Sequence, residues 1–167
     1  MKFNDNGYLQ PGLHEMSLDE IEIDFVDSFP SSNTRPKIME GYKRHRAEIS
    51  ALCAFYEQFI NGSFVSTKND PGDIDLVSFA DAQEIDNLSD EQKRQFRALF
   101  SGPDTKDTHL CDSYFVPTFP ENHPYFDECR SLRKYWMGEF GYDRLDRPKG
   151  IVKTEVYATV NEDQEDG

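Results

Sequence analysis

Two aspartates, Asp73 and Asp75, are the residues whose type and spacing point most directly to chemistry. An apolar run follows Asp75, so the pair is expected at positions i and i+2 of a strand, where side chains share one face. Two neighbouring carboxylates repel each other, and a divalent cation between them allows both to stay ionised. The spacing therefore predicts a Mg²⁺ or Mn²⁺ site that contains Asp73 and Asp75.

A Gly62-Ser63 pair precedes these aspartates and predicts a tight turn beside the cation. A turn of small residues lets backbone N–H groups approach a phosphate closely, and Ser63 adds a hydroxyl. Lys68, in the loop that follows, is a candidate phosphate ligand, although the favoured interpretation is that it is an exposed loop lysine without this role. Lys149 lies in a predicted turn that either folds back over the site or faces solvent.

The order of these motifs resembles the signature of the nucleotidyltransferase superfamily, which has the DNA polymerase beta-like fold. That signature is an apolar residue, Gly, Gly or Ser, a gap, and then Asp-apolar-Asp or Glu. A third carboxylate lies on a neighbouring strand in this family, and the matching residue here is Asp112. Residues 7–14 and 135–151 also look like an uncharacterised family of small bacterial and phage nucleotidyltransferase-like proteins, so that the resemblance spans nearly the whole chain.

The resemblance implies roles for each matched residue. Asp73 and Asp75 would bridge two Mg²⁺ (or Mn²⁺) ions, one of which also holds a nucleoside triphosphate, while Gly62 and Ser63 lie against its phosphates. Asp112 would bind the second ion and orient or deprotonate the attacking hydroxyl. The implied activity is transfer of a nucleoside monophosphate to a hydroxyl on RNA, such as tRNA, or on a protein. Related small enzymes commonly act as toxins in toxin-antitoxin pairs or in phage defence.

Other interpretations stay open for the acidic residues. Asp73 follows the turn-forming residues 69–72 and is also typical of a loop-capping aspartate. Asp75 has apolar neighbours on both sides and needs a partner or a wet cleft. The alternative function is a catalytically weak member of the same fold, an antitoxin or regulatory subunit that binds a protein partner through its acidic surface. The position of Asp112 discriminates between these functions, because convergence with Asp73 and Asp75 favours catalysis.

The charge of the chain limits its partners. A net charge of −14 and a pI of about 4.6 disfavour a long nucleic-acid substrate unless basic residues are segregated on one face. Two predicted helices offer such segments, and a solvated helix surface explains each equally well. They contain Lys37, Lys43, Arg44, His45 and Arg46, and Arg130, Arg133 and Lys134.

Three cysteines without metal-binding spacing, an N-terminus without an apolar signal core, and apolar runs too short to span a bilayer predict a cytoplasmic protein with no membrane partner. Capping boxes at Ser17 and Ser89 predict helix starts, and apolar spacing predicts a long helix over 37–56. A further helix is expected over 125–140, and strands are expected around 73–79, 109–116 and 151–160. Within the 125–140 helix, Tyr135, Trp136 and Phe140 are expected in the core rather than as a base-stacking platform.

This order of elements predicts an α+β fold with a mixed β-sheet and helices mainly on one face, as in nucleotidyltransferases. Residues 1–160 are expected to form a single domain, with an irregular N-terminal arm over 1–16. Residues 161–167 hold four acids and no apolar residue, which predicts a disordered acidic tail.

Overall fold

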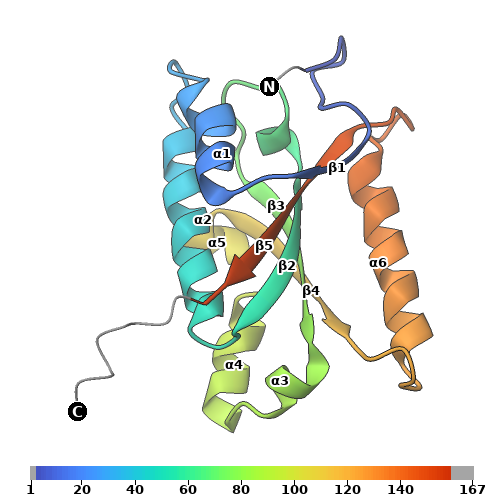
Figure 1. The fold of residues 1–167 in the computed structure, drawn as a ribbon. Helices are drawn as coiled ribbons and strands as arrows, with labels where there is room; N and C mark the ends of the chain where they lie inside the picture. Colours follow the sequence, from blue (N-terminus) through green and yellow to red (C-terminus); the bar gives the residue numbers. More distant parts are fainter. Residues whose placement is uncertain (1–2, 159–167) are drawn as a thin grey trace.

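The computed structural model describes residues 3–158, which form an α+β domain around a five-stranded mixed sheet (Figure 1). The strand order is β1-β5-β2-β3-β4. Strand β5 runs parallel to β1 and antiparallel to β2, whereas β3 runs antiparallel to β2 and parallel to β4. The elements are β1 (Gly12–Glu15), α1 (Leu18–Glu22), a π-helical turn (Ile23–Asp27), α2 (Arg35–Ser50), β2 (Phe55–Asn61), a 3₁₀ turn (Ser63–Val65), β3 (Ile74–Asp81), α3 (Ala82–Asp86), α4 (Asp90–Ala98), α5 (Thr105–His109), β4 (Cys111–Thr118), α6 (Phe126–Gly141) and β5 (Gly150–Tyr157).

Helices cover both faces of this sheet unequally. Figure 1 shows α1, α2 and α5 on one side of the strands and α6 on the other. Alternate residues of each strand face opposite sides, so Ile60 and Leu76 pack with α2 residues such as Tyr42, while Phe59 and Val77 pack towards α6. The predicted α+β class with a mixed sheet is therefore confirmed, and α6 is the helix that covers the second face.

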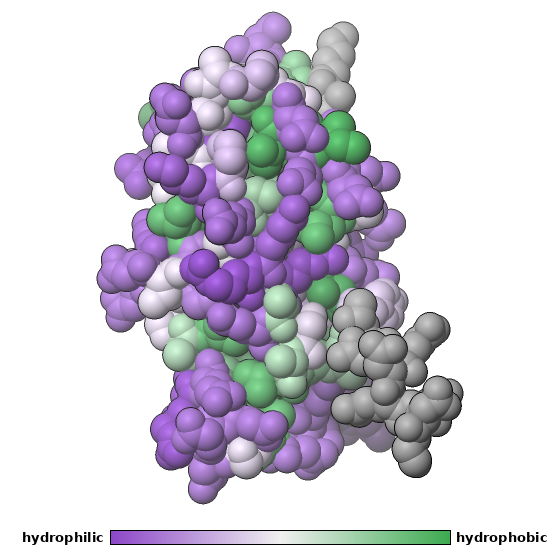
Figure 2. Space-filling model, turned by 90° about the vertical axis from the view of Figure 1, so that its left-hand side faces the viewer, coloured by the Kyte–Doolittle hydropathy of each residue, from purple (hydrophilic) through white to green (hydrophobic). Residues whose placement is uncertain are grey.

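The basic residues of α2 do not form a continuous patch on the surface of the protein. His45 is fully buried, Lys43 pairs with Glu22 at 2.7 Å, and Arg44 donates to the backbone oxygen of Thr108. Figure 2 shows this side of the molecule as mostly hydrophilic, with hydrophobic side chains in small separate patches. These contacts favour a structural role for Lys43, Arg44 and His45 over a nucleic-acid contact.

Several boundaries of helices and strands that were predicted from local sequence patterns are confirmed. Ser17 forms its capping box with Glu20 and Ser89 forms one with Gln92, and α1 and α4 begin immediately after these serines. Strand β5 and helix α6 occupy the predicted ranges to within two residues over the part that the structure describes. Residues 161–167, the predicted tail, lie outside the described residues.

Two predictions about the N-terminal half are wrong. The arm over 1–16 contains β1, whose four residues pair with Gly150–Lys153 of β5. The helix predicted to reach Tyr56 ends at Ser50, and Tyr56 belongs to β2. Tyr56 and Phe59 have helical spacing, but in the structure Tyr56 packs towards α2 and Phe59 towards α6, because alternation along β2 separates them.

Within residues 3–158, no helix combines the length and apolar character needed to cross a membrane.

Candidate active site

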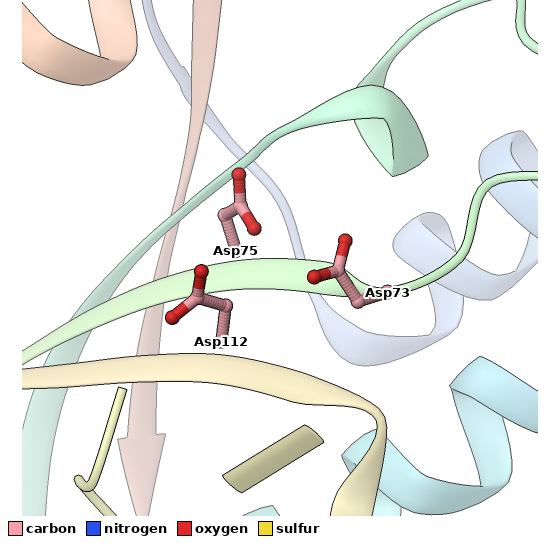
Figure 3. Close-up of side chains that lie close together, drawn as sticks. All are labelled: Asp73, Asp75 and Asp112. Atoms are coloured by element: carbon pink, nitrogen blue, oxygen red, sulfur yellow. The ribbon is translucent and has the colours of Figure 1, made fainter. Parts of the chain in front are cut away.

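Three carboxylates meet where the parallel strands β3 and β4 begin. Asp75 is the register partner of Asp112 on β4, and Asp73 immediately precedes β3. One oxygen atom from each of the three carboxyl groups lies within 4.8 Å of the others. Figure 3 shows the side chains of Asp75 on β3, Asp73 just before this strand and Asp112 on β4 gathered on one side of the two strands. The structure thus brings together the three acids that were predicted from the sequence as site residues.

Gly62 makes room for this arrangement. It follows β2 with a φ of +83°, a conformation that favours glycine, and β2 places its last residue, Asn61, beside Asp75. A Cβ atom added at Gly62 would lie 2.6 Å from Asp75 Oδ2. The glycine predicted to approach phosphates therefore also lies against the central carboxylate of the site.

Buried Arg35 holds the loop that follows Gly62. Its Nη1 donates to the backbone oxygens of Phe25 (2.8 Å) and Phe64 (2.7 Å), and its Nη2 donates to those of Ser66 (2.9 Å) and Lys68 (2.5 Å). Burial lowers the pKa of Arg35 to about 10, which still leaves the guanidinium charged at neutral pH. A single side chain from the start of α2 thus fixes the backbone next to the acids.

The three acids lie in an unequal electrostatic field. Burial, followed by the charges of Asp73 and Asp112, raises the pKa of Asp75 to about 7. Lys106 of α5 opposes this repulsion: its Nζ lies 2.8 Å from Asp73 Oδ2 and 3.7 Å from Asp112 Oδ2. This ammonium group forms ion pairs with two of the three acids.

A cleft of about 460 Å³ opens beside the acids, between the sheet and the C-terminal half of α6. Besides Asp75 and Asp112, its lining includes Asn61, Tyr114, Tyr135, Trp136 and Lys149. Lys149, which immediately precedes β5, therefore lies at the cleft. Burial lowers the pKa of Lys149, and the charge of Asp75 opposes this shift.

The remaining predicted residues are less closely tied to the cluster. Ser63 begins the 3₁₀ turn and its backbone oxygen accepts from Ser66 Oγ at 2.6 Å. Lys68 is exposed, and its backbone oxygen and N–H group form hydrogen bonds with Arg35 and Ser66. The cations at the site are instead Lys106 and Lys149.

Sequence reasoning missed three residues at the site. Lys106 belongs to a one-turn helix without a strong pattern, and Tyr114 shares the α6 face of β4 with Asp112. Asn61 stands where the nucleotidyltransferase signature, which the sequence only resembles, has an apolar residue, and this departure is a signal that would have marked it.

The donor set fits a divalent cation. All three side chains offer carboxylate oxygens, which are the ligands that Mg²⁺ and Mn²⁺ prefer. Asp112 Oδ1 is a buried oxygen without a hydrogen-bond partner among the described residues. Buried polar atoms normally have partners, so an unpaired carboxylate oxygen at a cluster of acids fits coordination of a cation.

Comparison with known proteins yields a family without an assigned activity. The profile of DUF6932, a family of unknown function, matches residues 1–155. No curated protein and no solved structure matches the chain.

Proposed function

The chain belongs to the DUF6932 family, whose function is unknown, and we propose from its site that it is a Mg²⁺-dependent nucleotidyltransferase. The observation that carries this proposal is the convergence of Asp73, Asp75 and Asp112 within 4.8 Å. The Gly62 turn beside Asp75 and the strand positions of the acids support it, since both agree with the superfamily pattern that the sequence resembles. The transferred group is a nucleoside monophosphate, and the acceptor is a hydroxyl on RNA or protein.

The residues of the site have distinct tasks in this reaction. Asp73, Asp75 and Asp112 would hold the cation, which when bound supplies Lewis-acid activation and compensates charge on the entering and leaving oxygens. Asp112 also orients the acceptor hydroxyl and takes up its proton. The acceptor oxygen forms a bond to the α-phosphorus, the bond from that phosphorus to the β-phosphate oxygen breaks, and pyrophosphate leaves.

Lys106 and Lys149 lie on either side of this reaction centre. Lys106 contacts two of the acids, and Lys149 lines the cleft next to Asp75. A triphosphate brings several negative charges into a site that already holds three carboxylates. Cations at both sides lower the electrostatic cost of binding it, because ammonium groups act as point charges towards phosphate.

The arrangement favours catalysis over the binding-module alternative. A displaced Asp112 or a cleft filled by the C-terminal strand would favour that alternative. Asp112 is in register with Asp75, and β5 lies in the sheet between β1 and β2, with the cleft open beside the acids. A role in a toxin-antitoxin pair or in phage defence would follow from the identity of the acceptor.

Transfer of label tests this proposal directly. Purified protein is incubated with each α-³²P-labelled nucleoside triphosphate, Mg²⁺ or Mn²⁺, and either total tRNA or cell lysate. Asp75→Asn and Asp112→Asn remove charge with little change of shape, and Asp107→Asn, an exposed residue of α5, is the matched control.

We expect label transfer by the wild type and by Asp107→Asn. Loss of one catalytic carboxylate should reduce the rate by about 10²-fold or more, which is the lower range of general acid-base and electrostatic contributions. Folded wild-type protein that transfers no nucleotide to any acceptor, or variants at Asp75 and Asp112 that remain fully active, would overturn the proposal.

A further inference from the structure

The cleft beside the acids has one polar and one aromatic wall. Asn61, Asp75 and Asp112 form a row across β2, β3 and β4, because each is the register partner of the next. The next row on the same face of the sheet ends in Tyr114, against which Trp136 of α6 packs. A ligand in the cleft therefore meets amide and carboxylate groups of the sheet on one side, and aromatic rings together with Glu139 of α6 on the other.

Asn61 presents an unpaired acceptor in this row. Its side chain is 1% exposed, and its Nδ2 donates to the backbone oxygen of Gly150 at 2.8 Å. A backbone oxygen only accepts, so the amide nitrogen must occupy that side and Oδ1 must occupy the other. Oδ1 is buried and has no donor within residues 3–158. A buried carbonyl oxygen without a donor is unfavourable, and a hydroxyl or amino group of a ligand would satisfy it.

The aromatic wall offers an accessible ring surface. The Trp136 and Tyr114 ring centroids lie 4.7 Å apart, and the Tyr135 ring lies 5.5 Å from Trp136 in an edge-on arrangement. Trp136 is half-buried, whereas Tyr135 is 56% exposed and thus does not belong to the core that helical spacing predicted. Exposed rings in a cleft are suited to stacking on a planar ligand, and every nucleobase has such a face.

We propose that this cleft binds a nucleoside, with the base against Tyr135 and Trp136 and a ribose hydroxyl donating to Asn61 Oδ1. This inference rests on the proposed function, because it names what the cleft holds next to the reacting phosphate. The volume of about 460 Å³ is in the range of small-molecule sites. The nucleoside belongs either to the nucleoside triphosphate or to the 3′ end of an acceptor strand.

The chain carries its own reporter for this test, since Trp136 is its one tryptophan. Tryptophan fluorescence is excited at the red edge of the absorption band, corrected for absorption by the ligand, and followed during titration with adenosine, guanosine, cytidine or uridine. The titrations contain EDTA, so that a bound metal plays no part. We expect saturable quenching by at least one ribonucleoside.

Two variants locate the ligand within the cleft. Tyr135→Ala should weaken binding at least about fivefold, which corresponds to the loss of one stacked ring. Tyr125→Ala is its matched control, because Tyr125 is 57% exposed and immediately precedes the other end of α6. Asn61→Ala should weaken binding about two- to tenfold. It should also abolish the preference of the wild type for adenosine over 2′-deoxyadenosine or 3′-deoxyadenosine, which a merely structural role of Asn61 would leave in place.

The source of the nucleoside follows from two further ligands. Tighter binding of a nucleoside triphosphate in the presence of Mg²⁺, lost in Asp75→Asn, assigns the cleft to the triphosphate. Tighter binding of a short oligoribonucleotide than of the nucleoside, independent of Mg²⁺, assigns it to the acceptor strand. Either outcome supports a nucleoside site.

No saturable quenching by any nucleoside, or equal affinities for the wild type, Tyr135→Ala and Asn61→Ala, would overturn the inference. Intact nucleotidyl transfer under those conditions would refute the nucleoside cleft alone. Loss of transfer with nucleoside binding retained would refute the proposed reaction and keep the cleft.

Discussion

Asp75→Asn is expected to stabilise the metal-free protein at neutral and alkaline pH, although it removes a residue of the proposed active site. Asp75 lies between Asp73 and Asp112 in a partly buried position, and its ionised form is disfavoured there: burial and the two neighbouring charges raise its pKa to about 7. The amide keeps the shape of the side chain and removes the charge. The folded state therefore gains more from this substitution than the unfolded chain does.

The magnitude follows from the difference in proton affinity between the two states. The carboxyl group has a pKa of 3.8 in the unfolded reference and about 7 in the folded protein, a difference of about three units. Each unit is worth about 1.4 kcal/mol, which sets an upper limit of about 4 kcal/mol. Water in the cleft and relaxation around the charge reduce this value, so a gain of about 2 to 4 kcal/mol is expected.

The effect depends on pH in a defined direction. Between about pH 4 and pH 7 the folded protein binds a proton at Asp75 that the unfolded chain has released, so the contribution of Asp75 to stability falls as pH rises through this window. Above about pH 7 both states are ionised and the full penalty is present. The stabilising effect of Asp75→Asn should therefore be close to zero near pH 4 and largest near pH 8.

Urea unfolding in EDTA, measured on both proteins from about pH 4 to pH 8, tests this prediction. Asp107→Asn, which changes an exposed carboxyl group on α5, should show no comparable pH-dependent difference from the wild type. A wild type that is more stable than Asp75→Asn near pH 8, or a difference that does not shrink towards pH 4, would refute the reasoning about mutual repulsion.

Three further substitutions test the parts that surround the acids. Gly62→Ala should cost about 1–3 kcal/mol in urea unfolding and weaken Mn²⁺ binding, because φ is +83° and the new methyl group would meet Asp75 Oδ2 at 2.6 Å; unchanged Mn²⁺ affinity would contradict the close approach. Arg35→Leu should cost about 3–5 kcal/mol, because four backbone oxygens lose their donor, whereas exposed Lys37→Met should cost little in the same unfolding experiment. Lys106→Met should strengthen Mn²⁺ binding, measured by calorimetry, roughly two- to fivefold. The substitution removes an exposed ion pair that competes with the cation and is worth about 0.2–1 kcal/mol. Weaker binding would mean that Lys106 supports the cation rather than competing with it.

The elements that were predictable from sequence are those with local causes. Ser17 and Ser89 cap helices through residues three positions away, and these starts were found. Strand β1 was missed because its four residues are mostly exposed and become a strand only by pairing with β5, far away in the chain. Tyr56 was assigned to a helix because its spacing satisfies both periods, and only the tertiary packing decides between them.

The site residues can also be separated into those that local sequence predicted and those that depend on strand pairing. Asp73 and Asp75 come together because they are two residues apart, although Asp73 precedes β3 instead of lying in it as predicted. Asp112 was found through a family resemblance, because the spacing within either strand does not determine the register of β3 against β4. Lys106 reaches the acids from a helix of five residues, and Asn61 joins them through the pairing of β2 with β3. Contacts of this kind depend on the assembled sheet, so sequence patterns could not supply them.

Titration of the metal-free protein with Mn²⁺, followed by the loss of the free-ion electron paramagnetic resonance signal, tests the central claim most directly. The claim predicts stoichiometric binding to the wild type and to Asp107→Asn at about pH 8, and much weaker binding to Asp75→Asn and Asp112→Asn. Equal Mn²⁺ affinity in all four proteins, or no binding to the folded wild type, would contradict it.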